Sequence, residues 1–167
     1  MTLVTMVRTT LLRDLGAMRR TVEAYPDDAS LWKPLGGAPN AGGTLVQHCC
    51  GNVQAYIGAA LGNTGYVRDR DAEFSQREAT RAQLVKKLGA TMVAVERALD
   101  TYPADDASMS AAFPQKVGGH SLKVETFLVH LTAHLAYHLG QLDYHRRGVT
   151  GSSEGVKAMS IDELPEL

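Results

Sequence analysis

Four of the six histidines of this chain lie on one stripe of a predicted helix, where their spacing suits metal chemistry. His130, His134 and His138 recur every four residues, and Gln141 and His145 continue the series. At about 100° per residue these side chains fall within an arc of roughly 80°. Neutral imidazole is the commonest biological metal ligand, and two histidines four residues apart on a helix can share one ion. The stripe therefore indicates a metal site, with hydrogen-bonded core histidines as the alternative reading.

His48 is the candidate for a third ligand because it lies in a different predicted helix. Asn52 and Tyr56 follow it on the same helical face, and we expect them to line a pocket there. A third imidazole from a facing helix would complete a three-histidine site with open positions, as catalytic metal sites have. No glutamate lies between His134 and His138, so the HExxH pattern of zinc peptidases is absent.

Four long segments carry apolar residues every three or four positions, which predicts one buried face on each of four helices. Ser75 followed by Glu78 fits a capping box, which would start the third helix. Gly148 is the expected residue just past the end of the fourth helix. The predicted helices run from about residue 3 to 25, 44 to 61, 75 to 103 and 121 to 147.

The segments between these helices show little strand pattern, so we predict an all-α fold, a four-helix bundle. Two connections are long for a simple up-and-down bundle, which favours a crossover. We expect Trp32 and Leu35 to pack on one end of the bundle. The non-helical connections are read as an ordered loop at 26–43, a polar loop at 66–74 and an irregular segment at 104–119.

The chain reads as one domain of 167 residues, with the bundle in 1–150. Residues 151–167 form a polar tail that packs on the bundle or extends from it, with a short turn at 161–164. Hydrophobic residues make up 44% and the net charge is −1. No basic block points to nucleic acid, and no apolar run is long enough for a membrane span. Neither nucleic acid nor a membrane is therefore expected as a partner.

Cys49 and Cys50 are adjacent and form neither a CxxC metal motif nor a disulfide framework. Adjacent cysteines rarely pair, so a reducing, cytoplasmic compartment is expected. Both cysteines are rotated away from the face of His48, by about 100° and 200°. We interpret them as small buried residues rather than as ligands or redox groups.

The fourth predicted helix also carries a family pattern. Its motif, with x for any residue, is His134-x-x-Tyr137-His138-x-Gly140-Gln141, and a histidine early in the second helix, here His48, accompanies it. This combination resembles the DinB-like (YfiT-like) superfamily over most of the chain, up to residue 147. The charged segment 68–74 is similar to one branch of that superfamily. The resemblance implies a bundle with a crossover between the second and third helices.

The resemblance also implies chemistry at a site of three histidines, His48, His134 and His138. It implies a divalent ion, nickel or zinc, and a homodimer. Superfamily members with known activities use low-molecular-weight thiols, as bacillithiol S-transferases or mycothiol-dependent isomerases, and many have no known activity. Despite the name, they are not DNA polymerases.

Two histidines of the stripe fall outside the family pattern. His130 could support a ligand as a second-layer partner, or serve in helix capping or packing. His145 is expected at the bundle mouth, solvated or at a dimer interface. Gln141 could donate or accept a hydrogen bond at a ligand imidazole and fix its tautomer, with packing against backbone as an equal alternative.

Two classes of function follow from this reading. The first is an enzyme in which the metal activates a low-molecular-weight thiol, in the manner of an S-transferase, or a bound water. No acidic residue is placed as a general base, so catalytic residues beyond the metal ligands stay unassigned. The second is a non-enzymatic, dimeric module of a stress response that binds a metal and a small molecule.

Overall fold

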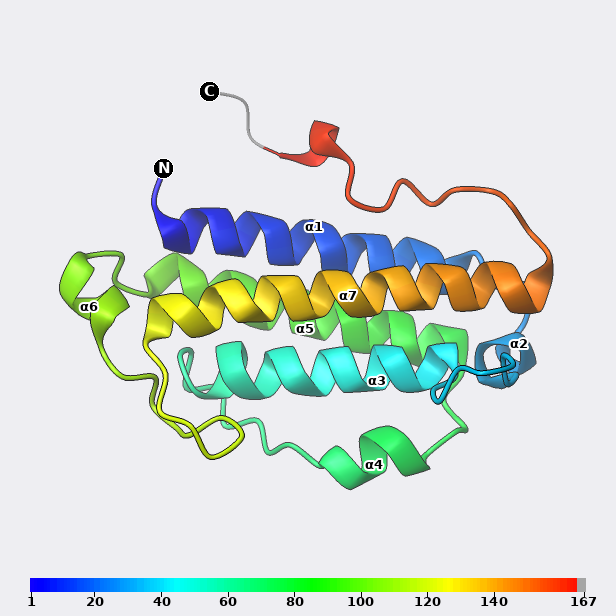
Figure 1. The fold of residues 1–167 in the computed structure, drawn as a ribbon, viewed down its shortest axis with the longest axis horizontal. Helices are drawn as coiled ribbons and strands as arrows, with labels where there is room; N and C mark the ends of the chain where they lie inside the picture. Colours follow the sequence, from blue (N-terminus) through cyan, green and yellow to red (C-terminus); the bar gives the residue numbers. More distant parts are fainter. Residues whose placement is uncertain (165–167) are drawn as a thin grey trace.

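Apolar residues spaced by three and four positions give each long helix a buried face, and these faces meet in one core. The computed structural model describes residues 1–164, and within them it is helical, with two isolated β-bridges and no strand (Figure 1). This confirms the predicted all-α bundle. The long helices are α1 (Leu3–Glu23), α3 (Gly42–Val53), α5 (Arg81–Thr101) and α7 (Val124–Thr150).

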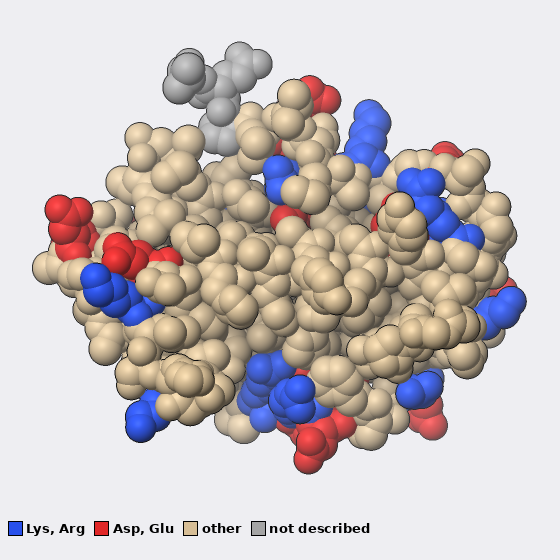
Figure 2. Space-filling view, viewed as in Figure 1, with Lys and Arg blue, Asp and Glu red and all other residues tan. Residues whose placement is uncertain are grey.

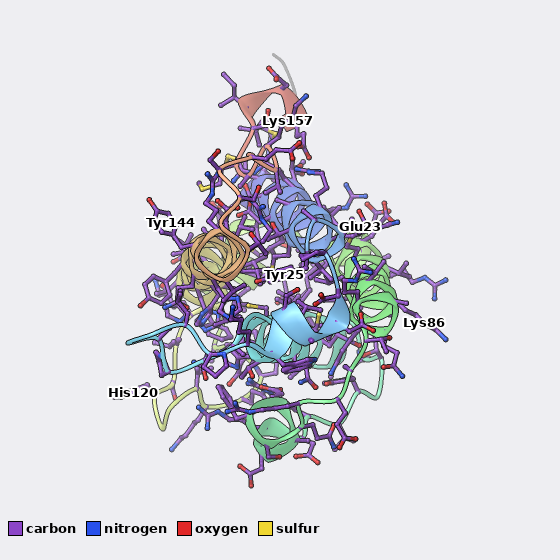
Figure 3. All side chains as sticks on the ribbon, turned by 90° about the vertical axis from the view of Figure 1, so that its right-hand side faces the viewer. Glu23, Tyr25, Lys86, His120, Tyr144 and Lys157 are labelled. Carbon is purple, nitrogen blue, oxygen red and sulfur yellow. The ribbon has the colours of Figure 1, made fainter. Side chains whose placement is uncertain are left out.

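The long helices occupy the four corners of a bundle, as the end-on view shows (Figure 3). Helix α1 packs against α5 and α7, and α3 packs against the same two helices from the opposite corner. In Figure 1, α1 and α7 run in one direction while α3 and α5 run in the other. Because α3 and α5 are parallel, the chain between them must return along the whole bundle. This return is the predicted crossover.

The second long helix does not end as a regular α-helix. After α3 the chain continues in a π-helical segment, Gln54–Ala59, in which the Ala60 amide donates to the Ala55 carbonyl five residues earlier. Asn63 and Gly65, both with positive φ, then turn the chain into the crossover. The predicted helix over 44–61 is thus right in extent, but its last part has π geometry, which often occurs beside functional sites.

Three short helices lie in the connections: α2 (Asp28–Trp32), α4 (Arg70–Ser75) and α6 (Asp106–Ser110). Trp32 covers the start of α3, where its indole fills the space that a side chain on Gly43 would need. Its Nε1–H donates to the carbonyl of Ala79 at 3.0 Å. Trp32 therefore packs on the bundle end as predicted, whereas the loops predicted at 26–43 and 66–74 each contain a short helix.

The predicted start of the third long helix at Ser75 is wrong. Ser75 is the last residue of α4, and α5 begins after Thr80, whose hydroxyl accepts from the Gln83 amide while the Gln83 side chain accepts from the Thr80 amide. The physical reason is a contact at Gln76, between Ser75 and Thr80. The Gln47 side chain donates to the Gln76 carbonyl at 2.9 Å, and Gln76 has extended backbone angles that end the first helix.

The predicted end of the last helix at Gly148 is also wrong. Helix α7 begins at Val124 and continues to Thr150, and Gly151 ends it with φ 71°. Gly148 lies inside the helix, where an added Cβ would come within 2.7 Å of the Leu35 side chain. The glycine therefore gives room for Leu35 instead of ending the helix.

The chain beyond α7 lies along α1 (Figures 1 and 3). Arg20 holds it there, because its guanidinium donates to the carbonyls of Val156 and Lys157 and pairs with Glu163. A 3₁₀ turn at Ile161–Glu163 agrees with the short turn predicted there. Residues 165–167 of the predicted tail lie outside the described residues. No helix in the described chain is both long and apolar enough to cross a membrane.

Candidate metal centre

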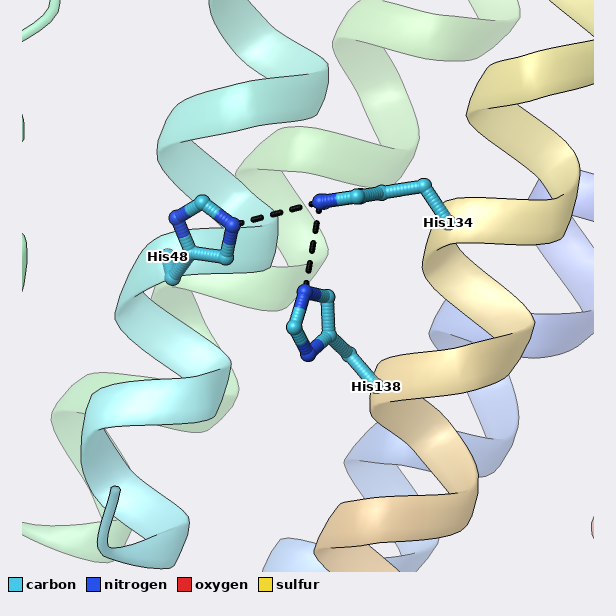
Figure 4. Close-up of side chains that lie close together, drawn as sticks. All are labelled: His48, His134 and His138. Atoms are coloured by element: carbon cyan, nitrogen blue, oxygen red, sulfur yellow. Dashed lines mark hydrogen bonds between the residues drawn. The ribbon is translucent and has the colours of Figure 1, made fainter. Parts of the chain in front are cut away.

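Helices α3 and α7 bring three imidazoles together between their facing sides (Figure 4), with His48 buried and the other two partly buried. The Nε2 atom of His134 lies 3.3 Å from Nε2 of His48 and 3.2 Å from Nε2 of His138. One ligand atom from each histidine lies within 4.8 Å of the other two. The rings meet at steep angles, 67° between His48 and His134 and 79° between His134 and His138. The structure thus places the three predicted residues at one point.

The hydrogen bonds on the far sides of two rings fix where their lone pairs point. The Nδ1 atom of His48 lies 3.1 Å from Oε2 of Glu73, and Nδ1 of His138 lies 2.7 Å from Oε1 of Gln141. Both oxygens are acceptors, so each Nδ1 carries the hydrogen and each Nε2 presents a lone pair. Both lone pairs face His134, where a hydrogen on Nε2 could serve only one of them. A cation between the three nitrogens would satisfy the whole set.

Two of the three rings, His48 and His134, lie in an environment that lowers their pKa and so favours the neutral form that a cation needs. Burial lowers the pKa of His48, and the neighbouring Glu73 only partly opposes this. Burial, together with the adjacent His138 and His48, lowers the pKa of His134 to about 4. The contact between His48 and Glu73 has the geometry of an ion pair. The lowered pKa instead identifies it as a neutral imidazole donating to a carboxylate.

The spacing of the nitrogens also fits a metal ion. Metal–nitrogen bonds of about 2.0–2.1 Å at tetrahedral angles separate two ligand nitrogens by about 3.4 Å. The Nε2 atom of His134 lies 3.3 and 3.2 Å from those of His48 and His138, close to that value. Three neutral ligands would leave such an ion open positions and its full positive charge. The donor set is therefore compatible with zinc or nickel.

Glu73 is a part of the centre that sequence reasoning missed. It lies on α4, is 3% exposed, and is held by Arg68, whose Nε and Nη2 donate to its two oxygens at 2.7 and 2.8 Å. The Nη2 atom also lies 3.3 Å from Nδ1 of His48. A guanidinium only donates, so this contact is a hydrogen bond only if Nδ1 lacks a hydrogen; the closer neighbour of Nδ1 is Oε2 of Glu73, at 3.1 Å, which only accepts and therefore favours a hydrogen on Nδ1. The signal in the sequence was only a carboxylate in a charge-rich segment.

The remaining predicted site residues lie around the three histidines in different ways. Gln141 contacts His138, as described above. His130 is exposed, with its ring 6.0 Å from that of His134 and stacked on Phe127. Asn52 is 8% exposed, and its Oδ1 has no hydrogen-bond partner in the described part of the chain. Tyr56 is half-buried against Phe127, at a ring separation of 4.9 Å.

His145 lies where the sequence did not place it. We predicted a solvated or interface position, but the ring is 2% exposed. Its Nε2 donates to the Lys33 carbonyl at 2.9 Å, and its Nδ1 lies 2.7 Å from the hydroxyl of Tyr25. Tyr25 points into the bundle beside α7 (Figure 3). Helix α7 continues past Arg147, so His145 lies inside its last turns and connects Lys33 with Tyr25, which follows the end of α1.

Comparison with known proteins identifies the chain's family. The family model described as Mycothiol-S-transferase matches residues 6–151. The chain belongs to this family. The match agrees with the DinB-like resemblance, and it includes every residue of the centre described above. The tail from residue 152 lies beyond it. Comparisons with curated proteins and with solved structures gave no match.

The mycothiol S-transferase family is named for thiol chemistry, and this chain has two thiols of its own. Cys49 and Cys50 are free and fully buried. Burial raises the pKa of the Cys49 thiol well above its usual value and that of Cys50 to about 11. Both thiols are therefore protonated near neutral pH and shielded from substrates. They act as small core residues, as the sequence indicated.

Proposed function

We propose that His48, His134 and His138 hold one divalent metal ion and that this centre transfers an electrophilic group to the sulfur of mycothiol. The observation that carries the proposal is the convergence of three Nε2 atoms, two of them with lone pairs turned inward, inside a chain that belongs to the mycothiol S-transferase family. Zinc and nickel are the proposed ions. Bacillithiol is the other thiol to be tested.

A bound divalent ion supplies Lewis acidity, which lowers the pKa of a thiol and favours the thiolate near neutral pH. Glu73 and Gln141 hold two of the three imidazoles, those of His48 and His138, in one orientation. In the proposed reaction the thiol sulfur forms a bond to an electrophilic carbon as that carbon's bond to a leaving group breaks. The thiol proton passes to solvent, and the leaving group departs with its electron pair.

Two observations limit which residues take part. Glu73 is already engaged by Arg68 and His48, so it is not free to act as a general base. Asn52 lies one helical turn from His48, and its buried Oδ1 has no hydrogen-bond partner among residues 1–164. We propose that this oxygen accepts a hydrogen bond from the substrate and that Tyr56 forms an apolar wall next to it.

The test is thiol consumption by metal-loaded protein with a generic electrophile such as a halogenated dinitrobenzene. Mycothiol, bacillithiol, glutathione and cysteine are compared, each with zinc-loaded and nickel-loaded protein. We expect wild-type protein to consume one of these thiols faster than the solution without protein does. This activity should be lost in His134→Ala. It should be retained in His120→Ala, which changes an exposed histidine away from the centre. Equal rates with wild-type protein and with His134→Ala would contradict the enzyme and favour a metal-binding module.

We also propose that two copies of the chain associate through the outer face of α7. This face exposes Val129, Tyr137 and Tyr144 by 52%, 64% and 77%, and residues 126–142 contain no acidic residue, lysine or arginine. Figure 2 shows charged side chains mostly toward the edges of this side of the molecule. An exposed uncharged stripe is typical of an interface, and a self-complementary one suits a two-fold dimer. Light scattering should give a dimer mass for the wild type and a monomer mass for Tyr137→Glu; a monomeric wild type would contradict this.

The compartment is a further proposal. The free, adjacent thiols of Cys49 and Cys50 are compatible with a reducing environment, and we propose the cytoplasm. Their state in protein isolated without reductant tests this.

A further inference from the structure

The crossover places a carboxylate behind one of the three histidines. Glu73 comes from α4, which lies outside the four long helices, yet its side chain is 3% exposed. A carboxylate at that depth is costly unless it is paired and hydrogen-bonded. Arg68 supplies both through its Nε and Nη2 atoms, and the Nδ1–H of His48 donates to the same Oε2 that Nη2 contacts.

Helix α3 is shaped to admit this carboxylate. An added Cβ on Gly51 would lie 1.9 Å from Oε1 of Glu73, so the glycine leaves the space that the carboxylate occupies. Phe74, the next residue of α4, lies against the His48 ring with a centroid separation of 5.1 Å. Two successive residues of the crossover thus fix both the plane and the far nitrogen of one imidazole.

We infer that Glu73 is a positioning residue for the metal centre, which orients His48 and holds it in the tautomer whose Nε2 lone pair points at the ion. The inference rests on the proposed function, because it assigns a role at the same centre. A carboxylate that accepts from the far nitrogen of a ligand histidine raises the basicity of that ligand and fixes its direction.

The partner of Glu73 defines how this effect operates. Arg68 carries a positive charge next to the carboxylate, so the pair adds little net charge near the ion. Glu73 therefore acts mainly through the hydrogen bond that it accepts. If the ion pair of Arg68 and Glu73 served only to hold the crossover in place, Oε2 would not need to accept a hydrogen bond from His48 as well. This distinction makes a neutral acceptor at position 73 informative.

The first experiment measures zinc and nickel affinity by chelator competition in wild type, Glu73→Leu and Glu73→Gln. The control is Asp71→Asn, which removes an exposed carboxylate from the same short helix. We expect Glu73→Leu to weaken binding by about 10- to 100-fold, Glu73→Gln to restore part of the loss because its amide oxygen still accepts, and Asp71→Asn to match the wild type. An unchanged affinity in Glu73→Leu would overturn the inference.

Two additions keep the test decisive. If Glu73→Leu does not fold, Gly51→Ala displaces the same carboxylate without removing it, and the same loss of affinity is expected. If the wild type binds no ion, the proposed function fails, and ¹⁵N chemical shifts of the ring nitrogens in metal-free protein then decide this inference separately. We expect His48 to carry its hydrogen on Nδ1 in wild type; a hydrogen on Nε2 would overturn the role of Glu73.

Discussion

The Oε1 atom of Gln141 lies 2.7 Å from Nδ1 of His138, one helical turn further along α7. Gln141 orients His138 as Glu73 orients His48. In each pair the side-chain oxygen accepts a hydrogen bond from Nδ1 of the histidine, so the Nε2 lone pair faces the centre. Two of the proposed ligand histidines are thus oriented by different elements, His138 by the helix that carries it and His48 by the crossover.

Replacing Gln141 should weaken the metal site without disturbing the fold. In Gln141→Leu the Nδ1–H of His138 loses its acceptor, and we expect about a 10- to 100-fold loss of metal affinity. Chelator competition measures this, with circular dichroism as a check that helix content is unchanged. Gln141→Glu keeps an acceptor and should bind more tightly than Gln141→Leu. Equal affinity of wild type and Gln141→Leu would mean that Gln141 serves only in packing.

The position of the capping box can be tested by stability. Thr80→Ala removes the side chain that accepts from the Gln83 amide, and such caps stabilise a protein by about 1 kcal/mol. The matched variant Ser75→Ala removes a hydroxyl that contacts only the Asp71 carbonyl within α4, so its effect should be small. Urea unfolding with a chelator present compares the two. The reverse order of effects would show that α5 begins at Ser75.

The two cysteines should be inert in the folded protein. Their thiols are buried, and the pKa of Cys50 is raised to about 11. We expect neither Cys49 nor Cys50 to react with a disulfide reagent at mildly alkaline pH, and both to react once the protein is unfolded in guanidinium. Rapid reaction in the native state would contradict their assignment to the core.

Acid should destabilise the protein in part through His145. Burial lowers the pKa of this histidine, and its Nδ1 can accept from the Tyr25 hydroxyl only while the ring is neutral. Below pH 6.5, the ordinary pKa of histidine, the ring therefore binds a proton more readily in the unfolded chain than in the folded chain. The stability due to a neutral His145 is fully present above pH 6.5. It is lost as the pH falls through the lower pKa that His145 has in the folded protein.

His145→Gln is the variant that isolates this effect. With chelator present, the free energy of unfolding should fall less steeply with acid in His145→Gln than in wild type, because the two proteins differ only in the imidazole at position 145. Parallel curves would show that His145 does not contribute.

The sequence allowed prediction of the features that depend on periodicity. Helical spacing placed His134 and His138 on one face and His48 on another helix, and the apolar stripes predicted the four helices whose packing joins them. Connection length favoured a crossover, and the family resemblance placed it between the second and third helices. These features are local in the chain, so no tertiary contact was needed to predict them.

The features that could not be predicted depend on contacts between distant segments. Ser75 and Thr80 both begin plausible capping boxes, and the bond from Gln47 to Gln76 decides between them. Gly148 resembles a helix end until Leu35 packs against it. Glu73 resembles any surface carboxylate of a charged loop, because its burial depends on how α4 docks over α3.

The metal content of untagged protein tests the central claim most directly. Wild-type protein is loaded with metal and passed over a desalting column. It should then retain one divalent ion per chain, as measured by elemental mass spectrometry. His134→Ala should retain none, because it removes the nitrogen that lies 3.3 and 3.2 Å from the other two. A wild type without stoichiometric metal, or a His134→Ala variant with the same content, would contradict the three-histidine centre.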